Sequence, residues 1–176
     1  MPTILKIFTT QVLGKCQEIA SKEEERIEEA SRVLAQTILS DGQLYFAGTS
    51  ELAGLPFAAT MGDERLPKSQ FLFEDGTLPT LTPLDCVVLF SKEGQDGETF
   101  AIIEEIKKTS ATIIGISRNE ASPLSEQVDF HISYHLEDGI LPTDEGGRTG
   151  YPHAFLAHYV YYALSLNTIE ILEEYK

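Results

Sequence analysis

The apolar run LYFA at residues 44–47, followed by Gly48, Thr49 and Ser50, constrains the fold more than any other stretch of this sequence. No polar residue interrupts the run, which is typical of a central parallel strand covered on both faces. The turn then supplies backbone N–H groups and two hydroxyls at the carboxyl end of the strand, where an anion can bind ahead of a helix. An ordinary strand-to-helix connection has the same pattern, so the turn alone does not establish a ligand site.

Further apolar runs with strand character follow along the chain, separated by helical patterns. The strands are expected at 44–47, 69–73, 85–90, 111–116 and 130–133, and helices are expected to begin near residues 56, 99 and 152. Strands that alternate with helices form parallel sheets with right-handed crossovers. We therefore predict an α/β fold with three layers, built on a doubly wound five-stranded parallel sheet in the flavodoxin-like order 2-1-3-4-5. Ligands of such sheets bind between the first and third strands, here at the turn after residue 47 and the polar loop 91–99.

Two helical patterns precede the first strand. Apolar residues at helical spacing cover residues 3–20, and SKEE at 21–24 matches a capping box that would begin a second helix ending near residue 40. We expect a helical hairpin over residues 1–40 that packs on the sheet or on a second subunit. Together with a core made of residues 42–134 and a C-terminal helix at 152–174, it would complete a single domain over residues 1–176.

The C-terminal part of the chain combines a long polar stretch with an apolar helix. Residues 135–150 are rich in Gly, Asp and Glu, and a loop of this length is either functional or disordered. The helix after it is expected to bury one apolar stripe against the core. The residues of that stripe are Phe155, Tyr159, Tyr162, Leu166 and Ile169.

The charge of the chain argues against two classes of partner. The sequence has 13 Lys and Arg against 28 Asp and Glu, for a net charge of -15. This charge repels nucleic acid and anionic membrane surfaces, so we expect neither as a partner. No apolar run is long enough to span a bilayer, and the N-terminus lacks the features of a signal peptide. With Cys16 and Cys86 as the only cysteines, we expect a cytoplasmic protein.

Four segments of the chain together resemble the SIS (sugar isomerase) domain. They are LTPLDCVVLFS at 81–91, the Gly-x-Thr helix start at 97–99, ATIIGIS at 111–117 and VDFHI at 128–132. The similarity covers nearly the whole chain, and the leader and tail resemble a small, uncharacterised family of short SIS-like bacterial proteins. The resemblance implies a two-helix lead-in, a five-stranded parallel sheet and a phosphosugar ligand. Single SIS-domain proteins commonly assemble as dimers or tetramers through their outer helices, so a homodimer or higher homo-oligomer is implied.

The SIS resemblance also implies a ligand site. Its turn after the first strand matches Gly48, Thr49 and Ser50, and its Ser-x-Ser-Gly-x-Thr loop matches Ser91, Gly97 and Thr99. Asp96 stands before Gly97 where the SIS loop has serine. A carboxylate there would repel a phosphate at close range unless it points away.

The resemblance to phosphoheptose isomerase, a SIS member, is weaker. Pro56 and Thr60 occupy the positions of its histidine and catalytic glutamate after the first turn. Both histidines of its last helix match His153 and His158, but the glutamine and glutamate before them are absent. Two histidines five residues apart point roughly 140° apart on a helix and cannot readily share one metal. We therefore expect no zinc site and no cofactor.

An aldose–ketose isomerisation needs a base with a pKa near neutrality and groups that stabilise an enediolate. His158 is the best matched base and Glu51 is a second candidate, although a packed histidine and a first-turn glutamate are equally ordinary structural features. At the tip of the fourth strand lie Ser117 and Arg118, and Arg118 could clamp an anion or be a surface arginine. Two hypotheses remain: an SIS-like protein that binds a phosphosugar or related anion, and a sugar-phosphate isomerase.

Overall fold

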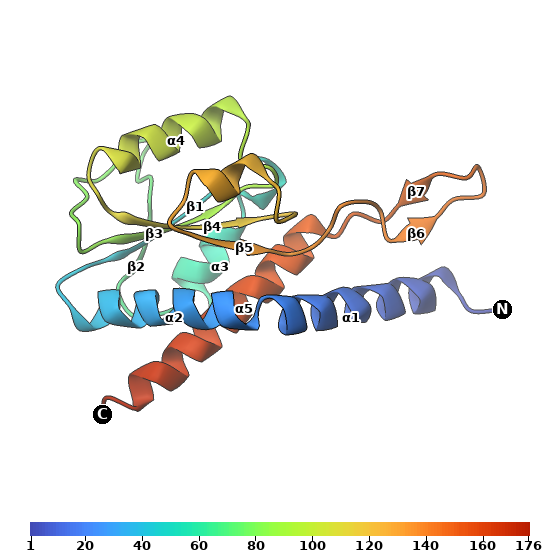
Figure 1. Ribbon diagram of the computed structural model, residues 1–176, viewed down its shortest axis with the longest axis horizontal. Coiled ribbons are helices and arrows are strands. Elements are labelled where there is room, and N and C mark those ends of the chain that lie inside the picture. The colour runs from blue at the N-terminus through green and yellow to red at the C-terminus, as the bar shows by residue number, and fades with distance from the viewer.

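The computed structural model describes residues 1–176 and contains a five-stranded sheet (Figure 1). Its strands are β1 (Leu44–Gly48), β2 (Ser69–Phe71), β3 (Cys86–Phe90), β4 (Thr112–Ser117) and β5 (Phe130–Ser133). They lie in the order β2-β1-β3-β4-β5, and every neighbouring pair is parallel. The predicted sheet is therefore confirmed, including the reversal of strand order between β1 and β3.

Helices cover both faces of the sheet (Figure 1). The helix α4 (Gly97–Lys107) and the short η2 (Pro123–Glu126) lie on one face. The other face carries α2 (Glu24–Leu39), α3 (Leu55–Met61) and α5 (His153–Glu173). Because successive strand residues point to opposite faces, Phe46 and Val88 belong to one apolar cluster while Tyr45 and Val87 belong to the other. The three layers are as predicted.

The two N-terminal helices differ from the expected hairpin in how they are joined. The helix α1 (Ile4–Lys22) and α2 follow each other almost end to end, with Glu23 as the only residue between them (Figure 1). The predicted capping box does not form, because Ser21 remains inside α1 and donates its hydroxyl to the Glu18 carbonyl. A single intervening residue cannot reverse the chain, so α1 continues past the edge of the sheet.

The expected buried stripe of the last helix was wrong for three of its five residues, whereas Tyr159 and Ile169 are partly buried and pack against the core. Phe155, Tyr162 and Leu166 are exposed to 56%, 43% and 55%, respectively. The residues of α5 that pack against the core include Leu156, Val160, Tyr161 and Leu164. The helix is apolar on nearly all sides, so its sequence pattern did not identify the buried face.

The polar stretch after β5 forms a short arm rather than an irregular loop. Within it, β6 (Leu141–Pro142) pairs antiparallel with β7 (Arg148–Thr149), and the arm lies above α1 (Figure 1). Among the helices, none combines the length and the apolar character needed to cross a membrane.

Candidate functional site at the carboxyl edge of the sheet

The turn after β1 is shaped by a close approach of the backbone. A Cβ on Gly48 would lie 2.2 Å from the Leu52 carbonyl oxygen, so only glycine fits. Ser50 follows with a positive φ of 52° and begins the one-turn helix η1 (Ser50–Leu52). The N–H of Thr49 donates to the Phe90 carbonyl at 3.0 Å, which joins this turn to the end of β3.

Three buried hydroxyls meet where the two strands end. Thr49 Oγ1 and Ser91 Oγ each lie 3.1 Å from Thr99 Oγ1, and all three residues are buried. They come from the β1 turn, the end of β3 and the first turn of α4. These are the hydroxyls that the sequence analysis assigned to one pocket, and the fold brings them into contact.

Asp96 points toward these hydroxyls rather than away from them. It precedes α4 as its N-cap residue, and its carboxylate accepts from the Thr99 N–H at 2.8 Å, from the Thr99 hydroxyl at 2.7 Å and from the Ser91 hydroxyl at 3.4 Å. Partial burial opposes ionisation of Asp96, but these hydrogen bonds together outweigh it and hold the carboxyl pKa below its usual range. Gly97 beside it has open space at its Cβ position.

Ion pairs surround this cluster at the same edge. Glu51 lies 2.9 Å from Lys92, and Arg118 lies 3.0 Å from Glu93. The Arg118 guanidinium also donates to the carbonyls of Leu136 and Glu137. Both proposed charged residues, Glu51 and Arg118, therefore lie at the edge with partners of their own.

A hollow of about 240 Å³ opens beside these ion pairs. Its lining residues are Ser50, Lys92, Glu93, Gln95 and Asp96. Ser50 and Asp96 connect it to the hydroxyl cluster, so a small ligand in this hollow would contact both turns.

Two buried aromatic groups beside the edge were not among the predicted site residues. His153, the first residue of α5, has Nδ1 2.9 Å from the Tyr134 hydroxyl, and both side chains are buried. Burial lowers the pKa of His153, and burial raises the pKa of Tyr134. At pH 7 the pair is therefore a neutral imidazole and a protonated phenol. The match of His153 to the phosphoheptose isomerase pattern was the one sequence signal that could have identified it.

His158 and Ser117 lie in different surroundings. His158 makes no hydrogen bond and stacks on Tyr162, with ring centroids 4.6 Å apart, and burial lowers its pKa. Ser117 is fully buried and its hydroxyl lies 2.5 Å from Nε2 of His131 and 2.6 Å from the Ser122 hydroxyl. The Ser117 hydroxyl therefore contacts β5 and the segment between β4 and β5. It does not contact the hydroxyls of Thr49, Ser91 and Thr99.

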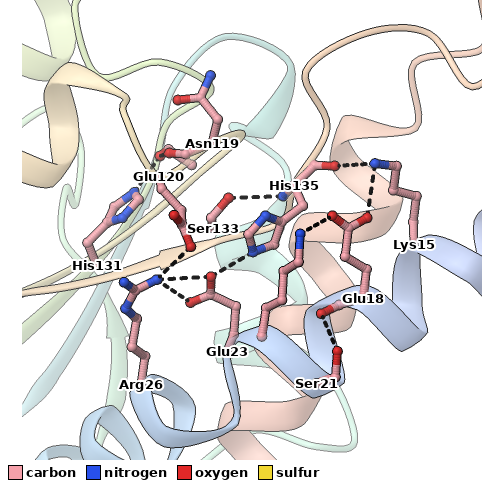
Figure 2. A network of polar contacts seen from close by, with 12 residues as sticks. Lys15, Glu18, Ser21, Glu23, Arg26, Asn119, Glu120, His131, Ser133 and His135 are labelled. Atoms are coloured by element: carbon pink, nitrogen blue, oxygen red, sulfur yellow. Dashed lines mark hydrogen bonds and ion pairs between the residues drawn. The ribbon is translucent and has the colours of Figure 1, made fainter.

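A second polar network lies between the N-terminal helices and the end of β5 (Figure 2). Glu23 is fully buried, with His135 Nε2 at 2.7 Å and Arg26 Nη1 at 3.1 Å from its carboxylate. Glu120 contacts Arg26 at 3.2 Å. The ligand atoms of Glu23, Glu120 and His135 lie within 4.8 Å of one another, which is the spacing of a cation site. Arg26 forms ion pairs with both carboxylates, so the network already holds one cation of its own.

A cavity of about 760 Å³ lies next to this network. It is bounded by α1, by the segment after β5 and by the arm, and its charged lining includes Lys15, Glu18, Lys22, Asp138 and Arg148. Basic and acidic groups alternate around it, and Lys15 and Lys22 both pair with Glu18. The lining of this cavity is therefore neither uniformly basic nor uniformly acidic.

Comparison with protein families gives a match over almost the whole chain. Residues 4–172 match the model of a family described as Domain of unknown function (DUF2529). A relative in Bacillus subtilis, the uncharacterized protein YwjG, is 33% identical over 174 residues, which cover 98% of this chain and 99% of the relative.

Solved structures with the same fold include sugar-phosphate proteins of lower sequence identity. The Methanococcus jannaschii protein MJ1247, for which a function of 3-hexulose-6-phosphate isomerase has been inferred, is 18% identical with a TM-score of 0.62, over 97% of this chain and 89% of its own. The Vibrio vulnificus NanR protein complexed with ManNAc-6P is 14% identical with a TM-score of 0.69, over 99% of this chain and 64% of its own. The chain has the SIS-like fold of these proteins.

Proposed function

We propose that this chain, which belongs to the DUF2529 family, binds a carbohydrate derivative of the phosphosugar class at the carboxyl edge of its sheet. The observation that carries the proposal is the contact between the hydroxyls of Thr49, Ser91 and Thr99 at the point where strand order reverses. Ligands of doubly wound sheets bind at this point. Gly48, Ser50 and Gly97 complete the two turns, while Arg118 extends the site toward the end of β4, beside the buried Ser117.

The comparisons support this class of ligand. NanR is complexed with ManNAc-6P and MJ1247 has an inferred sugar-phosphate isomerase function, and both share the fold over nearly all of this chain. Sugar hydroxyls suit an edge that offers serine and threonine hydroxyls together with charged groups.

A second candidate function is an aldose–ketose isomerisation of a sugar phosphate. It is favoured by the neutral imidazole of His153, held 2.9 Å from the Tyr134 hydroxyl beside the same edge. Glu51 and His158 are the other candidate bases. Turnover of a ketose phosphate that His153→Gln, Glu51→Gln or His158→Ala removes, with folding retained, would establish catalysis, and no turnover with any ketose phosphate would leave binding alone.

We also infer a cytoplasmic homodimer or higher homo-oligomer. The exposed aromatic and aliphatic face of α5, formed by Phe155, Tyr162 and Leu166, would be buried between copies of the chain. Residues 1–176 would act as one domain in each subunit.

Binding is tested by thermal unfolding with a panel of sugar phosphates and the matching unphosphorylated sugars. A true ligand at about 100 times its Kd should raise the Tm by about 5 to 10 °C. The rise should disappear in Ser50→Ala and Thr99→Val. Ser21→Ala, another exposed serine on the far α1 helix, is the matched control and should keep the full rise. No rise with any ligand in folded protein would contradict the proposal.

A further inference from the structure

The Asp96 carboxylate fills the position that an external anion would take at the proposed site. One oxygen accepts from the Thr99 backbone N–H at 2.8 Å, and the other accepts from the Thr99 hydroxyl at 2.7 Å and the Ser91 hydroxyl at 3.4 Å. Donors of this kind, at the start of an α-helix, are those that hold a phosphoryl group in many proteins. Here they hold a side chain of the same loop.

The protons of the buried hydroxyls are all used by this arrangement. Each hydroxyl has one proton to donate. The Thr99 proton goes to Asp96, which is the shortest contact and the only charged acceptor. Thr49 then donates to Thr99, and Ser91 donates to Thr99 or to Asp96 while accepting from the Gly94 N–H at 3.0 Å. No hydroxyl proton of the cluster remains for a bound anion.

The charges at this edge also disfavour a bound phosphoryl group. The two nearby cations, Lys92 and Arg118, are each paired with a glutamate, Glu51 and Glu93 respectively. Asp96 is a third carboxylate with no cation of its own in the described contacts, and its lowered pKa keeps it ionised at neutral pH. The edge therefore carries an excess negative charge beside the place where a phosphoryl group would sit.

We infer that Asp96 is an intramolecular competitor for the anion-binding donors of Ser91 and Thr99, and that it lowers the affinity of this site for the phosphoryl group of a ligand. The inference rests on the proposed function for its location. In the wild-type protein a carbohydrate derivative places uncharged hydroxyls against the cluster, and a phosphoryl group enters only by displacing Asp96. Removing the Asp96 carboxylate frees the donors of Ser91 and Thr99. The remaining charges at the edge are then the two ion pairs of Lys92 with Glu51 and Arg118 with Glu93, which balance.

The test compares the Kd values of inorganic phosphate, fructose 6-phosphate and fructose by titration calorimetry at fixed ionic strength. In Asp96→Ser the charge and volume are lost, while serine remains a good N-cap for α4. Asp96→Asn removes only the charge and keeps the shape. Glu98→Gln removes a charge from the same helix turn without touching the cluster, and is the matched control.

Asp96→Ser should bind phosphate and fructose 6-phosphate about tenfold or more tightly than the wild type. The affinity of Asp96→Asn should lie between those of the wild type and Asp96→Ser, and the affinity of Glu98→Gln should equal that of the wild type. The Kd of fructose should not tighten. Equal phosphate affinity in wild type, Asp96→Ser and Asp96→Asn, all shown to be folded, would overturn the inference. A gain for inorganic phosphate with no binding of either sugar compound would support the inference and count against the proposed function.

Discussion

The carboxylate of Glu23 lies 2.7 Å from Nε2 of His135, although the two residues are 112 positions apart in the chain. Glu23 is the fully buried residue that joins α1 to α2, and His135 follows β5 with a positive φ of 51° (Figure 2). Arg26 contacts the same carboxylate. The junction of the two N-terminal helices is thus held to the carboxyl edge of the sheet by a buried side-chain contact between Glu23 and His135.

We expect His135→Ala to destabilise the fold by about 3 kcal/mol, because it removes one of the two side chains that contact the buried Glu23 carboxylate and leaves only Arg26. Urea unfolding followed by far-UV circular dichroism measures the change. Glu120→Ala removes an exposed member of the same network and should cost at most about 0.5 kcal/mol. Equal costs for the two variants would show that burial of Glu23 does not govern the stability of this network.

Acidification should destabilise the protein between about pH 6.5 and pH 4. Burial lowers the pKa of His131 from 6.5 in the unfolded chain to about 4 in the folded one. The unfolded state therefore binds more protons in this range, so the stability contribution is complete above pH 6.5 and is lost as the pH falls toward 4. Burial lowers the pKa of His153 and His158 too, and both act in the same direction.

The size of the effect follows from the His131 values. At pH 5 the loss from His131 alone is about 2 kcal/mol relative to pH 8. Unfolding free energies measured at both pH values for the wild type and His131→Gln give the difference directly. The variant should lose less stability on acidification than the wild type, and an unchanged pH dependence would contradict the assignment to His131.

Substitution of two glycines at the candidate site by alanine should change the free energy of unfolding in opposite directions. A Cβ on Gly48 would lie 2.2 Å from the Leu52 carbonyl oxygen, whereas a Cβ on Gly97 meets nothing within 4 Å. Gly48→Ala should therefore lower the free energy of unfolding by more than about 2 kcal/mol, because backbone must move. Gly97→Ala, in the first turn of α4, should be neutral or stabilising by up to about 1 kcal/mol. Chemical unfolding of both variants decides between these outcomes, and a tolerated Gly48→Ala would mean that the turn can rearrange.

The sheet was predictable because its strands are short apolar runs whose signal is local. Phe130–Ser133 was placed with its observed bounds, and the alternation of strands with helices predicted a parallel sheet. The junction at Glu23 was not predictable in the same way, since the partner that buries this glutamate lies at the end of β5. The sequence identified Asp96 as an obstacle to phosphate, but its contacts with Ser91 and Thr99 depend on how the loop folds back on α4.

The exposed face of α5 gives the last prediction. Phe155 and Leu166 are more than half exposed, and Tyr162 lies between them on the helix. If this face is the contact between subunits, Phe155→Glu should convert the oligomer to a monomer in sedimentation velocity, because a carboxylate cannot be buried there without a partner.

The subunit itself should keep its stability in Phe155→Glu, since the side chain does not pack in the core. Leu164→Ala, on the buried face of the same helix, is the matched contrast: it should lower the free energy of unfolding by about 3 kcal/mol through the cavity it leaves. A wild-type protein that sediments as a monomer at micromolar concentration would refute the homo-oligomer. An oligomer that survives Phe155→Glu would place the contact on another surface, and the exposed Leu5 and Leu13 of α1 are the next positions to substitute.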